Sequence, residues 1–501
     1  MKKILSAVMA AALLASVITA CGEAADTPAS QGTSADGGAG DTNLTAAEET
    51  EPSRENTPDN LPDDLDFGGA TVNIIYMGSE DSTHYDALGE ASGDIVYDAV
   101  YNRNISVEER LNVKLNWIAG SGDWDGYPSD IKKAMTAGVS DYDIVMMENS
   151  RLFEQSLSGY WRDLIDAEYL DYDQPWWYSA MMSDGAIDNN HRYFITGDVG
   201  LTTLMGASAI YFNKGMFENY FGDYNALYTT VTDGKWTHDV LAEYCRAVYS
   251  DLDGSTTVNA ADQFGFAYPQ WGVPNYLSMS TGLSFITRDA DGLPVLDMNN
   301  ELTIKWAETL ANLLYADNMA WDTTGGDDQH TMFKKNQTLF DIGMLSTANG
   351  LRDLTFEYGL IPHPKLTESL DYMSGAGVVN GEGAAIPVSA LTDNFERSCA
   401  VLEALCAESY RTVAPTWYET ALKIKYVATD TDAQMVDLIY SRITGPFIMM
   451  ADKAIGIGSI FTNVCYGNGG KADFASYWGK NEKSITKKWD KMIANYQEIS
   501  G

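Results

Sequence analysis

Basic residues are scarce in this 501-residue sequence, in which 32 lysines and arginines stand against 71 aspartates and glutamates, a formal net charge of −39. Such a charge excludes binding to nucleic acid or to anionic lipid headgroups through the overall field of the protein. Cysteine is also rare, with five residues, and none has the spacing of a metal site. The sequence has no P-loop, nucleophile elbow, dinucleotide-binding turn or H-E-x-x-H motif, so we expect no enzyme activity.

Long apolar runs are absent except at the N-terminus. Lys2 and Lys3 are followed by a small and apolar run over 4–17, which is too short to span a bilayer. Ile18-Thr19-Ala20-Cys21 then matches a lipobox, so we expect residues 1–20 to be a lipoprotein signal peptide and Cys21 to be lipidated. The alternative is an ordinary secretory signal followed by a chance cysteine.

Aromatic residues are missing from 22–66, a segment rich in small residues, proline and acids, with Arg54 as its one basic residue. Such a composition cannot bury enough apolar surface to fold. We therefore expect 21–66, lipidated Cys21 included, to be a disordered acidic tether. Lipid on Cys21, and not a spanning helix, would hold the protein on the outer face of the cytoplasmic membrane.

After this segment, β-rich and helical patterns alternate along the chain. Strands are expected at 71–76, 113–118, 143–147, 338–344, 358–361 and 383–387. Helices are expected at 95–111, 130–137, 152–165, 240–249, 302–314 and 394–407. This order predicts an α/β fold whose parallel sheet is covered by helices and binds ligands at the carboxyl ends of its strands. The remaining length is more than one core usually holds, so two domains are expected.

Several short motifs occur in a fixed order along the folded part. They are A-M-T-A-G-V-S-D-Y-D-I-V at 134–145, I-Y-F-N-K at 210–214, G-K-W-T-H-D at 234–239, D-Q-F-G-F at 262–266, the segment 333–344, Y-G-L-I-P at 358–362 and G-A-A-I-P at 383–387. In this order the chain resembles the extracellular solute-binding proteins of ABC importers, in the carbohydrate-type group that includes maltose-binding protein.

The resemblance implies a two-lobe periplasmic-binding-protein-like fold, each lobe a mainly parallel sheet flanked by helices, with crossover strands between them. The first lobe would comprise 67–206 and 375–412, and the second 207–374 and 413–501. A monomer of this kind would capture a sugar or oligosaccharide in the interlobe cleft and deliver it to ABC permease subunits. The alternatives are a binding protein for peptides or another non-sugar solute, and a surface glycan-binding or hydrolytic lipoprotein.

Tryptophan and tyrosine are plentiful, and flat aromatic rings suit the apolar face of a sugar. Trp124, Trp177 and Trp271 lie in expected loops or at their edges, where each could stack on a ligand or pack into a core. Most of the other tryptophans fit core positions in helices and strands. These three are therefore the candidate aromatic ligand contacts.

Polar candidates follow the expected strand at 143–147. Glu148, Asn149 and Arg151 come directly after it and should lie at its ligand-facing end, unless they form a solvated loop or pair with other charges. Gly375 falls at the expected return into the first lobe. It would either let backbone approach the ligand or act as a hinge.

An acidic loop at 251–262 has the ligand spacing of an EF-hand. Oxygen donors fall at the positions that such a loop uses, namely at Asp251, Asp253, Ser255, Thr257, Asn259 and Asp262. Glycine stands at the fourth position and not the sixth, and Asp262 replaces the usual glutamate. The loop also resembles a metal-binding turn of some family members. A structural calcium ion or an Asp/Gly-rich turn are the two interpretations, and the binding function itself requires no cofactor.

Overall fold

The computed structural model describes residues 54–139, 141–269, 272–326, 328–375, 377, 381–390, 392–418, 429–456 and 473–500. The predicted signal peptide, Cys21 and most of the predicted tether lie outside the described residues. Among the described helices, none is long and apolar enough to cross a membrane.

The end of the predicted tether packs onto the folded part of the chain. Leu61 is buried in the core, and Asp59 forms ion pairs with Arg110 and Arg411. The prediction of a tether up to residue 66 is therefore wrong for its last dozen residues. Composition averaged over the segment hides one apolar side chain and two basic partners that come from distant parts of the chain.

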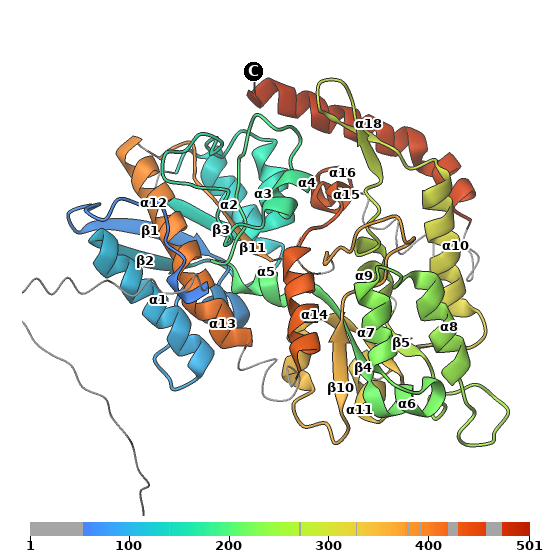
Figure 1. Ribbon diagram of the computed structural model, residues 1–501. Coiled ribbons are helices and arrows are strands. Elements are labelled where there is room, and N and C mark those ends of the chain that lie inside the picture. The colour runs from blue at the N-terminus through green and yellow to red at the C-terminus, as the bar shows by residue number, and fades with distance from the viewer. Residues whose placement is uncertain are drawn as a thin grey trace, which may run out of the picture. The chain divides into compact units, whose positions relative to one another are not determined.

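Four strands form the first sheet in the order β11-β3-β1-β2 (Figure 1). They are β1 (Ala70–Tyr76), β2 (Val113–Ala119), β3 (Ile144–Glu148) and β11 (Glu382–Ala385). Strand β1 is parallel to β2 and β3, as expected, whereas β11 is antiparallel to β3. Ile74 and Ile75 pack into different buried clusters, so both faces of the sheet are covered, as is usual for parallel strands.

Helices α1 (Ile95–Leu111), α2 (Gly126–Thr136), α3 (Asn149–Ser156) and α12 (Thr392–Glu408) accompany this sheet (Figure 1). The Asp94 side chain caps α1 by accepting from two main-chain N–H groups, and Asn112 ends it in the left-handed region at φ 47°. The helix expected at 152–165 ends early, at Ser156. Gly159 has φ +70° and turns the chain, so that Trp161 pairs with Pro387.

The second sheet has the order β10-β4-β9 and consists of β4 (Ser208–Asn213), β9 (Phe340–Met344) and β10 (Tyr358–Ile361). Its pairings are antiparallel. Parallel pairing occurs beside it, between β5 (Phe266–Tyr268) and β8 (Ala320–Asp322), and the N–H of Phe340 donates to the carbonyl of Gly265 next to β5. The mainly parallel sheet is thus confirmed for the first lobe, whereas the second lobe contains both antiparallel and parallel pairings. The prediction missed this difference because residue patterns do not fix the direction in which distant strands pair.

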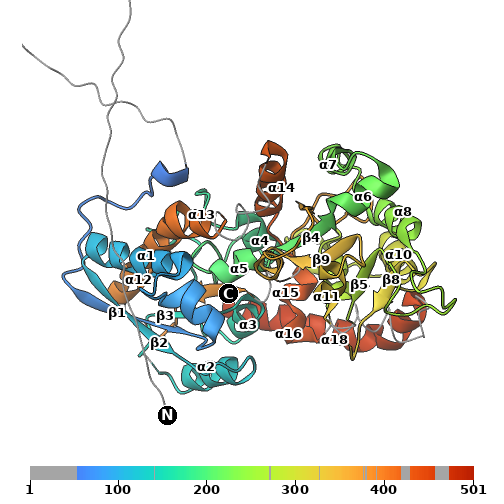
Figure 2. The same ribbon diagram turned by 90° about the horizontal axis from the view of Figure 1, so that it is seen from below.

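Helices α8 (His238–Val248) and α10 (Glu301–Tyr315) belong to the second sheet's core, where Trp306 is fully buried. Helices α14 (Asp430–Ser441), α15 (Phe447–Met450) and α16 (Asp452–Ile455) lie between the two sheets (Figure 2). Phe447 of α15 packs edge-on against Phe153 of α3, with ring centroids 5.6 Å apart. The long C-terminal helix α18 (Phe474–Ser500) packs Trp489 against Phe447.

Candidate functional site

A cavity of about 300 Å³ lies where strands of both sheets end. It is lined by residues that follow β1 and β2, by the start of β11, by α5 (Leu201–Met205) and α9 (Val273–Met279), and by residues at the end of β9. They are Ser79, Asp81, Ser82, Trp124, Thr202, Met205, Gly206, Tyr276, Met344, Ser346, Gly377, Gly381 and Glu382. Its position matches the rule that open α/β sheets bind ligands at the carboxyl ends of their strands.

Trp124 is the exposed aromatic side chain of this cavity. It follows β2, and 57% of its surface is accessible, which is unusual for a residue that otherwise favours cores. Tyr276 of α9 lines the same cavity and is partly buried. The cavity therefore combines an open indole face with hydroxyl and carboxyl groups, which is the chemistry that a sugar ring requires.

The first-sheet side of the cavity is acidic and closely hydrogen bonded. The hydroxyl of Ser82 donates to Oε1 of Glu382 at 3.1 Å. The main-chain N–H and the hydroxyl of Thr202 donate to Asp86 at 2.8 and 2.7 Å. Burial nevertheless raises the pKa of Asp86 to about 7, and burial together with Asp86 raises the pKa of Glu382 well above its usual range.

Glu148, Asn149 and Arg151 lie at the end of β3, as predicted, but they are not among the residues that line the cavity. Glu148 is buried and accepts from the Ser150 hydroxyl at 2.8 Å; burial raises its pKa. Asn149 is fully buried and donates to the carbonyl of Gly381 at 2.9 Å. Arg151 forms ion pairs with Asp125 and Glu154 at 2.6 and 3.1 Å. Local partners take up these side chains, which the sequence alone does not reveal.

Two other predicted contacts belong to the protein interior. Trp177 is 3% exposed and packs in the core of the first sheet, so its assignment to the ligand site is corrected. Gly375 does not line the cavity either: a Cβ there would lie 2.7 Å from the main-chain oxygens of Met279 and Thr444. Close backbone packing therefore requires glycine at this position. Trp271 lies outside the described residues, and its role stays a prediction.

Sequence analysis missed the residues that follow β1 and the start of β11. Asp81 and Ser82 come after a predicted strand, so the rule that singled out Trp124 could also have found them. Glu382 is different, because β11 joins the sheet from far along the chain. The glycines on either side of Glu382, Gly381 and Gly383, do not indicate that this residue lies at the cavity.

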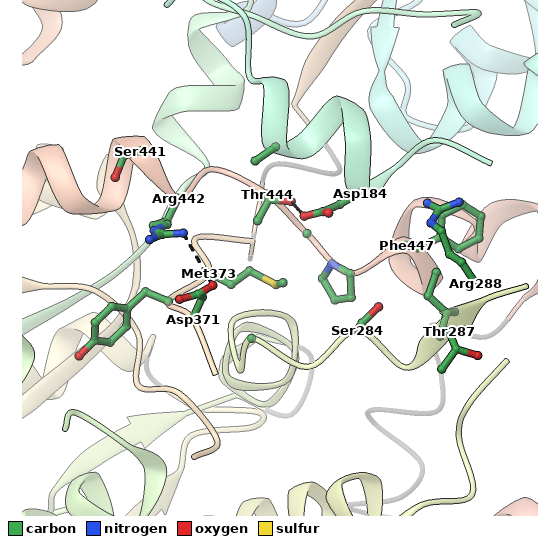
Figure 3. A pocket seen from close by; sticks show the side chains of 16 residues that line it. Asp184, Ser284, Thr287, Arg288, Asp371, Met373, Ser441, Arg442, Thr444 and Phe447 are labelled. Carbon is green, nitrogen blue, oxygen red and sulfur yellow. Dashed lines mark hydrogen bonds and ion pairs between the residues drawn. The ribbon is translucent and has the colours of Figure 1, made fainter. Parts of the chain in front are cut away.

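A second and larger cavity, about 420 Å³, is lined by α4 (Ser179–Asp184), β6 (Ile286–Arg288), the end of α14, the start of α15 and the loops beside them (Figure 3). The hydroxyl of Thr444 donates to Asp184 at 2.6 Å, and Arg442 lies 4.0 Å from Asp371. Arg288 donates to three main-chain carbonyl groups. The charged groups of this larger cavity thus already contact protein groups. The cavity also lies away from the ends of the first sheet's parallel strands. We take the smaller cavity as the candidate ligand site on these grounds.

The acidic loop between α8 and β5 gathers the predicted metal ligands into one turn. Asp251, Asp253 and Asp262 each offer a carboxylate oxygen, and these oxygens lie within 4.8 Å of one another. Asn259 donates to Asp253 at 3.1 Å and to the carbonyl of Thr257 at 2.9 Å, and the Ser255 hydroxyl also donates to that carbonyl.

Asp262 is fully buried, and its Oδ1 has no hydrogen-bond partner among the described residues. A buried carboxylate oxygen without a donor is unfavourable, and a cation would satisfy it. The donor set consists of oxygen atoms, as a hard cation prefers. The residues present therefore fit calcium.

Neither the family models nor the curated protein sequences compared with the chain match it. Many solved structures do. The sugar-binding protein MalE from Xanthomonas citri is 12% identical and has a TM-score of 0.55, over 86% of this chain and 98% of that one. The fold is that of a two-lobe solute-binding protein.

Two further solved structures have a similar fold. The ABC transporter associated binding protein from B. animalis subsp. lactis Bl-04, solved with β-1,6-galactobiose, is 13% identical with a TM-score of 0.52, over 84% of this chain and 98% of that one. UgpB from Mycobacterium tuberculosis, solved with glycerophosphocholine, is 14% identical with a TM-score of 0.50, over 87% and 100%. At such identities the likeness establishes the fold, while the ligands remain those of the proteins compared.

Proposed function

We propose that this protein is a lipid-anchored solute-binding protein that captures a sugar or oligosaccharide and delivers it to an ABC permease. The observation that carries the proposal is the exposed Trp124 ring in a polar cavity at the strand ends of a two-lobe fold. The indole face matches the apolar face of a sugar ring. Side chains such as Ser79, Ser82 and Ser346 can bind its hydroxyl groups.

Delivery requires that the permease distinguish loaded from empty protein. The cavity takes Asp81 from the first sheet's side and Tyr276 and Ser346 from the second, so a ligand that contacts both favours the closed arrangement of the lobes. Lipid on Cys21 would keep the protein beside its permease on the outer face of the cytoplasmic membrane.

A ligand screen tests this function. Purified protein is heated with mono- and oligosaccharides and with short peptides, because a tight ligand raises the melting temperature by mass action. We expect at least one saccharide to raise it and calorimetry to give one site per chain. A shift with peptides alone, or hydrolysis of a saccharide by the protein, would contradict the proposal.

We also propose that the loop 251–262 holds a structural calcium ion. Asp251, Asp253 and Asp262 would bind it, and the buried oxygen of Asp262 supports this role. None of these residues lines the ligand cavity. The ion would therefore stabilise the second lobe without contacting the solute.

A further inference from the structure

Glu382 places a carboxyl group at the ligand cavity, and too few hydrogen-bond donors reach this group. Glu382 is among the residues that line the cavity, although it is only 4% exposed. Ser82 donates to Oε1, whereas Oε2 is buried and has no hydrogen-bond partner among the described residues. Such an oxygen is costly unless a donor reaches it. A ligand that enters the cavity would supply that donor where it contacts Oε2.

The titratable groups around Glu382 are mostly acidic. Glu148 lies directly opposite it on the antiparallel strand β3, and Asp81 and Asp86 come from the segment after β1. Tyr127 of α2 is close enough for Glu382 to raise its pKa, which burial also raises. Like charges on opposite residues of neighbouring strands repel one another.

The positive charge in this region is held by other groups. Arg103 of α1 lies close to Asp86, but it donates its hydrogen bonds to the main-chain oxygens of Asp86 and Ala87, to Asn104 and to Ser409. The described residues that line the cavity include two acids, Asp81 and Glu382, and no lysine, arginine or histidine. A ligand therefore meets no basic side chain among these lining residues, and an anionic ligand is disfavoured.

We infer that the cavity recognises a sugar with a free, positively charged amino group, which pairs with Glu382 while the sugar ring lies against Trp124. The inference rests on the proposed function and narrows its ligand class. The ammonium group donates to Oε2, which lacks a donor, and Asp81 adds attraction from the cavity wall. The exposed indole of Trp124 favours a cation over its face as well as a sugar ring.

Binding of such a ligand has a proton balance that can be measured. Burial and Asp86 raise the pKa of Glu382 well above its usual range, which favours its carboxylic acid form in the empty cavity. An adjacent cation favours the carboxylate. The Glu382 proton therefore leaves to the solvent when the ammonium group binds, and the pair that forms is neutral overall.

The experiment compares tetramers of β-1,4-linked glucosamine, N-acetylglucosamine and glucose. The three tetramers differ only in the group on carbon 2 of each ring. Each is titrated into the wild-type protein by calorimetry at pH 5.5, where the amino groups of the ligand are already protonated, in two buffers of different ionisation enthalpy. We expect the glucosamine tetramer to bind on the order of tenfold more tightly than the other two, which corresponds to ~1.4 kcal/mol. Its binding should release protons, and theirs should release none.

The variant Glu382→Gln should lose both the preference for the amine and the proton release. Glu403→Gln is the matched control, because Glu403 is also a buried acid, with a pKa raised to about 8 by burial, but lies on α12 away from the cavity. The control should keep both properties. If Glu382→Gln does not fold, the proton release of the wild-type protein decides alone.

Equal or tighter binding of the glucose or N-acetylglucosamine tetramer would overturn the inference. Binding of the glucosamine tetramer without proton release, or no binding of it, would overturn it too. A neutral saccharide that binds tightly in the ligand screen leaves the proposed function intact and refutes only the amino-sugar specificity. Failure of every saccharide, charged or neutral, refutes both.

Discussion

The indole N–H of Trp177 donates a 3.1 Å hydrogen bond to Oε2 of Glu403. Its neighbour Trp176 donates to Oε1 of the same carboxyl group at 3.2 Å. Burial raises the pKa of Glu403 to about 8 despite these donors. Trp177, which the sequence nominates as a ligand contact, therefore holds a buried acid together with Trp176 in the core of the first sheet.

The protein should lose stability as the pH rises from about 7 to 8.5. In this interval folded Glu403, and Asp86 with its pKa of about 7, still hold protons that the unfolded chain has released. A carboxyl group whose pKa is raised in the folded state stabilises that state at pH values below its pKa in the unfolded chain, about 4. This stability is lost as the pH rises through the pKa of the folded state. We expect the melting temperature to fall across the interval.

The interval is chosen because two buried histidines act in the opposite sense at lower pH. Burial lowers the pKa of His238 to about 3 and of His363 to about 4, so their contribution to stability grows up to about pH 6.5 and then stays constant. Glu403→Gln should reduce the fall above pH 7, and the exposed Glu482→Gln should not. A wild-type melting temperature that stays level or rises would contradict the prediction.

Trp124→Ala should weaken ligand binding by about 1–3 kcal/mol, a range typical of important contacts. Folding should change little, because 57% of the side chain is exposed and its removal leaves no large internal cavity. Calorimetry with the ligand from the screen gives the affinity, and thermal unfolding gives the stability. Tyr101→Ala, an exposed aromatic on α1 outside the cavity, is the control and should keep full affinity.

If Trp124→Ala instead unfolds readily while its affinity is unchanged, the indole is part of the core and not of the ligand site. Trp271 can be tested in the same way, since its position in the sequence alone nominates it.

Calcium should raise the melting temperature of protein that has first been treated with a chelator. The ion would bind Asp251, Asp253 and Asp262 and favour the folded state by mass action. The double variant Asp251→Ala with Asp253→Ala should abolish this rise and leave ligand affinity unchanged. Asp289→Ala with Asp291→Ala, in the turn between β6 (Ile286–Arg288) and β7 (Pro294–Leu296), is the matched control and should respond as the wild type does. No calcium-dependent shift in the wild type would end the proposal.

Cys21→Ser should release the protein from membranes or leave its precursor unprocessed. The thiol of Cys21 is the attachment point that the lipobox predicts, and a serine there cannot form the thioether. Fractionation and metabolic labelling with a fatty acid measure the outcome. Lipid labelling that persists in the variant would refute the lipobox.

The sequence located regular elements well where local signals delimit them. Helix α1 has the predicted bounds because Asp94 caps its start and Asn112 ends it. Trp124 was found in the cavity because strand ends are visible in the residue pattern. Glu382 was not, because its place depends on antiparallel pairing of β11 with β3, which only the packing of distant segments determines. Arg151 follows β3 as predicted, but a sequence does not show which nearby acids will pair with it.

The late place of β11 in the chain has a consequence for folding after export. Asn149 donates to Gly381 beside the β3–β11 pairing, and these two residues are 232 positions apart. When an exported chain emerges from its N-terminal end, the edge of β3 is therefore present before its partner. Until β11 arrives, the main-chain N–H and C=O groups of this edge are open to strands of other chains. The incomplete first lobe should be the folding stage at which this protein depends most on a chaperone that keeps unfinished chains apart.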